Sequence, residues 1–171
     1  MCLQIDVGYN NIDEAASLLL IAAMKGKSME SIGMAGCELG VEGAKATAEL
    51  VSVMASLTRV DVRFNDLAGD SASQLSEVVL GNENIEVFNE VPIKQMRTDS
   101  LTELDLEGKY IGVEGCMVVA GLLPAMASLT SVWSPAHPTR VRTCSASALS
   151  QSTPAAYVCV YACLPCAAQS V

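Results

Sequence analysis

The stretch Leu101-Thr-Glu-Leu104-Asp-Leu106-Glu-Gly-Lys109-Tyr-Ile111-Gly-Val-Glu-Gly115 decides which fold this chain is expected to adopt. Leu104 and Leu106 alternate with charged residues, which predicts a short β-strand with both leucines on one face. Ile111 is expected to turn inward after a bend. The residues that follow have the small and apolar character of a helix that packs closely on a strand layer. The stretch therefore predicts a strand, a bend and a helix.

The same pattern occurs at three earlier places, so the chain contains an internal repeat. In each copy, two residues separate the first apolar residue from the second, and one residue separates the second from the third. After two more residues comes an Asn-like position, and after one more comes the last apolar residue. The earlier copies begin at Cys2, Met29 and Leu57. The Asn-like position, occupied by Asn10 and Asn65, is expected to hydrogen-bond backbone groups inside the bend.

The spacing of the copies is regular except at one place. The central strand residue recurs at Ile5, Ile32, Val60, Phe88, Leu104 and Val132. Successive positions are 27 or 28 residues apart, but only 16 residues separate Phe88 from Leu104. We therefore expect one shortened unit that has lost its helix.

Helices are expected between the other strands. In the segment 40–54 and the residue that follows it, apolar residues fall on one helical stripe, at Ala44, Ala48, Val51 and Ala55. Asp70 is a suitable N-cap for a helix over 71–80. No single unit can bury its apolar face alone, so stacking is expected to form one continuous core between strands and helices.

These segments resemble leucine-rich repeats of the ribonuclease-inhibitor and NOD-like-receptor type. The copy that starts at Leu101 matches best and departs only at Lys109, where that family prefers Asn. The resemblance covers residues 2–132. It implies an α/β fold: a right-handed βα solenoid, or horseshoe arc, with parallel strands on the concave side and helices on the convex side. It also implies protein recognition without catalysis and without a cofactor.

Composition favours a structural or binding protein over a hydrolase and argues against several other classes. Of 171 residues, 19 are acidic and 10 are basic, which gives a net charge of −9. A nucleic-acid binder would carry a basic surface instead. The single histidine, His137, leaves little for a two-histidine metal site or a histidine relay. We therefore expect no enzyme activity and no bound metal.

The strand residues that point away from the core are the candidates for partner contact. They are Asp6, Arg59, Asp61, Arg63, Asn89, Glu103, Asp105 and Glu107. In a stack of parallel strands these positions are expected to form columns about 4.8 Å apart and to make one surface. That surface is either a solvated sheet face without a partner or a protein-binding face. Its acidic excess favours a partner with a basic surface.

Residues 133–171 carry no repeat and are expected to form a disordered tail rich in Ser, Ala, Cys and Pro. The tail contains Cys159, Cys163 and Cys166, whose spacing resembles an iron–sulfur loop. Cys144 and His137 are further possible ligands. A metal or redox site here is a remote alternative. Enzymes with that iron–sulfur loop need a barrel after it, and only five residues follow Cys166, so a chance cluster is favoured.

No segment is predicted to cross a membrane, because the apolar run over 154–168 is shorter than the roughly 20 residues that a spanning helix needs. We expect a cytoplasmic protein with reduced thiols. The repeats also lack polar capping units. A second functional hypothesis is therefore an uncapped fragment or structural segment of a longer repeat protein, able to self-associate through its open ends.

Overall fold

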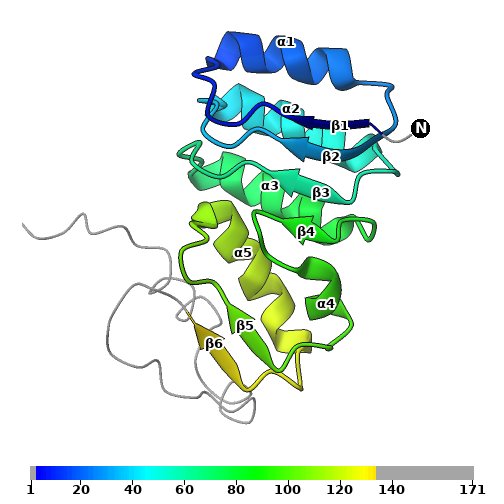
Figure 1. Ribbon diagram of the computed structural model, residues 1–171, viewed down its shortest axis with the longest axis vertical. Helices are drawn as coiled ribbons and strands as arrows, with labels where there is room; N and C mark the ends of the chain where they lie inside the picture. Colours follow the sequence, from blue (N-terminus) through cyan, green and yellow to red (C-terminus); the bar gives the residue numbers. More distant parts are fainter. Residues whose placement is uncertain (1–2, 134–171) are drawn as a thin grey trace, which may run out of the picture.

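The computed structural model describes residues 3–133, in which strands and helices alternate along the chain (Figure 1). The strands are β1 (Leu3–Asp6), β2 (Met29–Gly33), β3 (Arg59–Asp61), β4 (Val87–Phe88), β5 (Glu103–Asp105) and β6 (Ser131–Trp133). The helices are α1 (Glu14–Met24), α2 (Gly40–Val53), α3 (Gly69–Gly81), α4 (Ile93–Arg97), α5 (Gly112–Leu122) and the 3-10 turn η1 (Leu123–Ala125). The predicted mixed α/β class with parallel strands is confirmed.

The register between the strands follows the sequence repeat. Within a four-stranded parallel sheet in the order β1-β2-β3-β4, Ile5 pairs with Ile32, Ile32 with Val60, and Val60 with Phe88. These are the residues that the 27- and 28-residue spacing places at equivalent positions. In a second parallel sheet, β5 pairs with β6 through Leu104 and Val132. The repeat therefore predicts which residues lie side by side.

The parallel strands form two sheets, because the ladder is interrupted between β4 and β5. The interruption falls at the shortened unit, where 16 residues separate Phe88 from Leu104. Its helix is reduced rather than lost, since the single turn α4 takes its place and buries Ile93 and Met96 completely. One helical turn offers less length to support the next strand than the 11 to 14 residues of α1, α2, α3 and α5.

Strands and helices form two layers with the core between them (Figure 1). Ile32, Val60 and Phe88 from the sheet are at most 1% exposed. They pack with the helical stripe that the sequence predicts, including Ala44, Ala48 and Val51. Ala55, expected on the same stripe, lies beyond the end of α2 and is exposed.

The start of α3 differs from the prediction at Asp70. The helix begins at Gly69, with Ala68 at the N-cap, so Asp70 lies inside the first turn. A carboxylate there still interacts favourably with the positive end of the helix dipole. Within residues 3–133, no helix combines the length and the apolar character needed to cross a bilayer.

Arg97, at the end of α4, holds the shortened unit against the preceding helix. One guanidinium nitrogen, Nη1, donates to the carbonyls of Asn82 and Ile85, both at 3.1 Å. The other, Nη2, donates to the carbonyls of Val79 and Leu80, both at 3.0 Å. Carbonyls at the C-terminal end of a helix have no intrahelical donor, and a cation there also complements the helix dipole.

We expect Arg97→Ala to lower the free energy of unfolding by about 2–3 kcal/mol, because these carbonyls lose a charged donor. Arg97→Lys should recover only part of the loss, since one ammonium cannot serve two pairs of carbonyls. Urea unfolding followed by circular dichroism measures both effects. Lys94→Ala, on the same helix turn, removes only an exposed ion pair with Glu86 and should change stability by less than about 1 kcal/mol. Equal losses in Arg97→Ala and Lys94→Ala would contradict the role given to Arg97.

Candidate interaction surface

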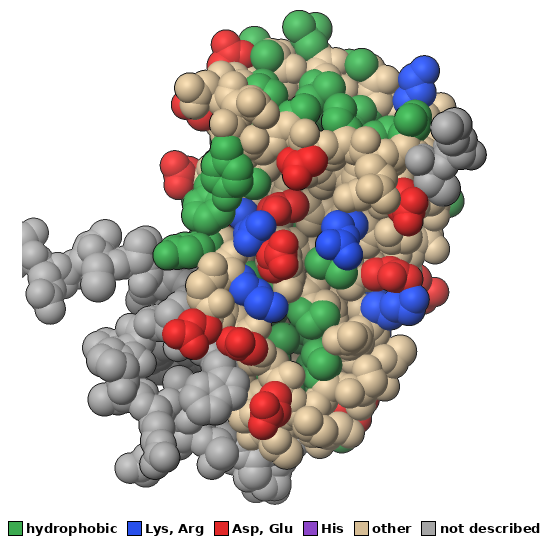
Figure 2. Space-filling view, in the orientation of Figure 1, with side chains coloured by type: hydrophobic (Ala, Val, Ile, Leu, Met, Phe, Trp, Pro, Cys, Tyr) green, Lys and Arg blue, Asp and Glu red, His purple; other side chains and the backbone are tan. Residues whose placement is uncertain are grey.

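The face of the sheets opposite the helices carries most of the predicted contact residues. Helices lie behind the strands in Figure 1, and Figure 2 shows the same side of the molecule with acidic and basic side chains mixed across its middle. The predicted residues that are exposed there are Asp6, Arg59, Glu103, Asp105 and Glu107. We call this surface the sheet face. Because β5 belongs to the second sheet, the acidic column on it does not continue the ladder of β1 to β4.

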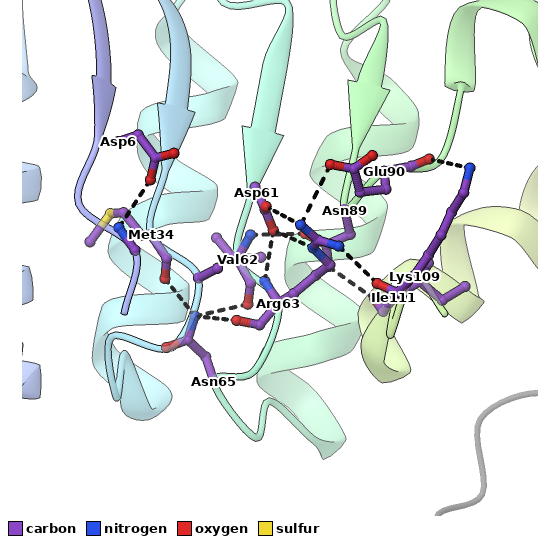
Figure 3. A network of polar contacts seen from close by, with 12 residues as sticks. Asp6, Met34, Asp61, Val62, Arg63, Asn65, Asn89, Glu90, Lys109 and Ile111 are labelled. Atoms are coloured by element: carbon purple, nitrogen blue, oxygen red, sulfur yellow. Dashed lines mark hydrogen bonds and ion pairs between the residues drawn. The ribbon is translucent and has the colours of Figure 1, made fainter. Parts of the chain in front are cut away.

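Arg63 and Asp61 also lie on this side but are bound to each other and to neighbouring units (Figure 3). Arg63 donates to both carboxylate oxygens of Asp61, from Nε at 2.9 Å and from Nη2 at 2.7 Å. Its Nη1 donates to the Lys109 carbonyl at 2.9 Å, and its Nη2 lies 3.5 Å from a carboxylate oxygen of Glu90. Arg63 therefore bridges the two sheets across the interruption.

The burial of this pair fits a structural role. The side chains of Arg63 and Asp61 are 17% and 24% exposed. The hydrogen bonds to Asp61 raise the pKa of the Arg63 guanidinium, and burial opposes that effect. An arginine whose donors are already used by a carboxylate and a carbonyl has little capacity left for a partner. Arg63 therefore holds neighbouring units together instead of serving as the contact residue that the sequence predicted.

The prediction that Asn89 contacts a partner is wrong, because its side chain is completely buried. Its amide oxygen accepts from the Val62 backbone N–H at 2.8 Å. Its amide nitrogen donates to the Ile111 carbonyl at 3.0 Å and to Glu114 at 2.8 Å. Strand β4 has only two residues, and Asn89 follows it with a φ of 48°, so the in–out alternation of a strand no longer applies.

The Asn-like position behaves as predicted at Asn65. Its amide oxygen accepts from the backbone N–H groups of Cys37 and Leu39, at 2.9 and 3.1 Å. Its amide nitrogen donates to the carbonyls of Met34 and Val62, both at 2.8 Å (Figure 3). These contacts fix the bend of one unit against the bend of the next.

Three exposed aromatic side chains, which the sequence pattern does not single out, form a row at the bends that follow the strands. Tyr9, Phe64 and Tyr110 are 65%, 45% and 69% exposed. The ring centroids of Tyr9 and Phe64 are 5.7 Å apart, and those of Phe64 and Tyr110 are 5.3 Å apart. We call this row the aromatic strip. Hydrophobic side chains gather along one edge of the molecule in Figure 2.

The contact between Tyr9 and Phe64 depends on a glycine. In the repeat, Gly36 occupies the position of Tyr9 and Phe64, and a Cβ there would lie 3.0 Å from the Tyr9 ring. The Tyr9 ring therefore crosses the unit of β2 to reach Phe64. All three aromatic residues have φ between 50° and 59°, a left-handed backbone that is uncommon for bulky side chains.

Within residues 3–133 no group of three or more metal-binding side chains comes together. Cys37 and Cys116 are buried, and burial raises the pKa of the Cys37 thiol, which makes it a poor nucleophile. Cys144, Cys159, Cys163, Cys166 and His137, together with the predicted tail over 133–171, lie outside the described residues apart from Trp133 at the end of β6.

Comparisons with known proteins add no identification. No protein-family model matches the chain, and no curated protein matches it.

Glu114 lies beneath the surface, bonded to Asn89, and is 2% exposed. Burial raises the pKa of its carboxyl to about 7, and the charge of Asp61 adds to this rise. Hydrogen bonds from its own backbone N–H and from Asn89 lower the pKa and offset part of the effect. An unfolded glutamate titrates near 4.3. Between these values the folded state holds a proton that the unfolded state has released. The contribution of Glu114 to the free energy of unfolding therefore falls as the pH rises through this window.

We expect Glu114→Gln to gain about 2–3 kcal/mol of stability relative to the wild type between about pH 5 and about pH 8. The neutral amide keeps an oxygen acceptor for Asn89 and has no charge to bury. Urea unfolding at several pH values measures the difference. Glu42→Gln, at the equivalent and exposed position of α2, leaves Glu114 in place and should retain the pH dependence of the wild type. Parallel pH profiles for Glu114→Gln and the wild type would contradict the assignment.

Proposed function

We propose that the chain is a non-catalytic protein-interaction module, built as a leucine-rich-repeat solenoid, that binds a partner protein through the sheet face. The observation that carries this proposal is the match between the sequence repeat and the strand register, in which Ile5, Ile32, Val60 and Phe88 form one ladder. A stack of this kind covers one side of the sheet with helices and leaves the other side to solvent.

The chemistry of the sheet face supports a partner with a basic surface. Glu103, Asp105 and Glu107 form an acidic column on and after β5, and all three are exposed. On β3, the exposed Arg59 is accompanied by Asp61 and Arg63, which are largely occupied with each other. The net charge on the free side chains is therefore negative. Complementary charge mainly accelerates association, and salt weakens the effect.

Charge reversal at matched sites tests the proposal. The sheet-face variant carries Glu103→Lys, Asp105→Lys and Glu107→Lys. The helix-side control carries Glu49→Lys, Glu77→Lys and Glu83→Lys, which change three exposed carboxylates by the same total charge. Circular dichroism checks that both variants fold.

Wild type and both variants are used as bait in the same cell lysate, and the bound proteins are quantified by mass spectrometry. We expect a set of proteins that the wild type and the helix-side control retain and that the sheet-face variant loses by about tenfold, as expected for a reversed electrostatic surface. For such a protein, association with the wild type should slow as salt increases. Equal recovery by all three baits would contradict the proposal.

A further inference from the structure

The bends at the carboxyl ends of the strands are rich in exposed carboxylates as well as in aromatic rings. Parallel strands bring these ends to one edge of the molecule. The exposed carboxylates on and just after the strand ends are Asp6, Glu38, Asp66, Glu90, Asp105 and Glu107. Two cations also lie at these ends: Arg63 is paired with Asp61, and the Lys109 ammonium donates to the Glu90 carbonyl at 3.4 Å. The carboxyl ends of the strands, where the aromatic strip lies, therefore carry a net negative charge.

An acidic, aromatic surface fits a cation. The face of an aromatic ring attracts ammonium and guanidinium groups within about 6 Å of its centroid. The fold already contains one such contact, since the Arg63 guanidinium carbon lies 6.0 Å from the Phe64 centroid. Exposed carboxylates nearby would strengthen the attraction and orient the cation.

The spacing of the rings fits an extended chain. Alternate side chains of an extended segment lie on the same side about 6.6 Å apart. The ring centroids in the aromatic strip are 5.7 and 5.3 Å apart, which is close to that interval. Arg or Lys at alternate positions could then meet successive rings.

We propose that the aromatic strip of Tyr9, Phe64 and Tyr110 binds an extended segment of a partner protein that carries Arg or Lys at alternate positions. This inference rests on the proposed function as a protein-interaction module and adds the class of partner and the edge of the sheet face on which it lies. A proline-rich segment also docks on aromatic rows but would gain nothing from the carboxylates, so the basic segment is favoured.

Fluorescently labelled ten-residue peptides of alternating residues test the proposal, with binding measured by fluorescence anisotropy. The basic peptide alternates Arg with Ser, and the comparison peptides alternate Gln with Ser, Glu with Ser, or Pro with Ser. We expect the basic peptide to bind at least tenfold more tightly than the others. Equal binding of the Gln or Pro peptide, or no binding of the basic peptide at about millimolar concentration, would overturn the proposal.

Because the chain carries a net charge of −9, an Arg peptide is attracted to it even without a specific site. The decisive variant therefore keeps every charge: Tyr9→Leu, Phe64→Leu and Tyr110→Leu together remove the ring faces and retain apolar side chains. We expect this variant to bind the basic peptide about tenfold more weakly, from the loss of three exposed cation–π contacts. Leu19→Ala, at an exposed apolar residue of α1, should leave binding unchanged.

A second variant leaves the rings in place and disturbs their alignment. Gly36→Asn tolerates the left-handed backbone at this position, where φ is 60°, and its side chain would displace the Tyr9 ring. We expect weaker binding of the basic peptide, with only a small loss of thermal stability because Asn accepts this backbone at a modest cost. Wild-type affinity in both the triple Leu variant and Gly36→Asn would overturn the inference.

The two proposals can fail separately. If charge reversal on the sheet face removes proteins from the lysate while the triple Leu variant binds the basic peptide normally, the sheet face binds partners and the aromatic strip is not the site. If the peptide requires the rings but no protein depends on the sheet face, the sheet-face proposal fails and binding is confined to the aromatic strip.

Discussion

Buried bends between strand and helix carry backbone groups that must be hydrogen-bonded, and the side chain of Asn65 meets this need between two neighbouring units. It accepts from the N–H groups of Cys37 and Leu39 and donates to the carbonyls of Met34 and Val62. An unpaired polar group in the core would be costly, so one asparagine fixes how the second and third strands can lie relative to each other. The hydrogen bonds of Asn65 therefore support the register that pairs Ile32 with Val60.

The shortened unit shows how the same requirement is met where the repeat breaks. Asn89 takes over the role of the bend asparagine, but it does so directly after a two-residue strand and reaches forward to Ile111 and Glu114. Arg97 supplies donors to the end of α3, and Arg63 connects the bends on either side. Polar side chains thus join two sheets that share no strand ladder.

The repeat spacing predicts the register, the core and the layer order, because each depends on residues at fixed intervals. It predicts Asn89 wrongly, because alternation cannot reveal that the strand ends at Phe88. Arg97 leaves no sequence signal, since all its acceptors are backbone carbonyls. The aromatic strip is equally hidden. Tyr110 lies two positions later in its unit than Tyr9 and Phe64 do, and Tyr9 reaches Phe64 because Gly36, between them, has no side chain.

Gly36 has a consequence for how such a chain can change through duplication. In an array of interchangeable modules, adding or removing one module preserves both the scaffold and its surface. An additional module between the first and third strands would place Tyr9 one strand further from Phe64 and break their contact. The order and number of modules are therefore constrained by side chains at the surface as well as by the packing of the interior.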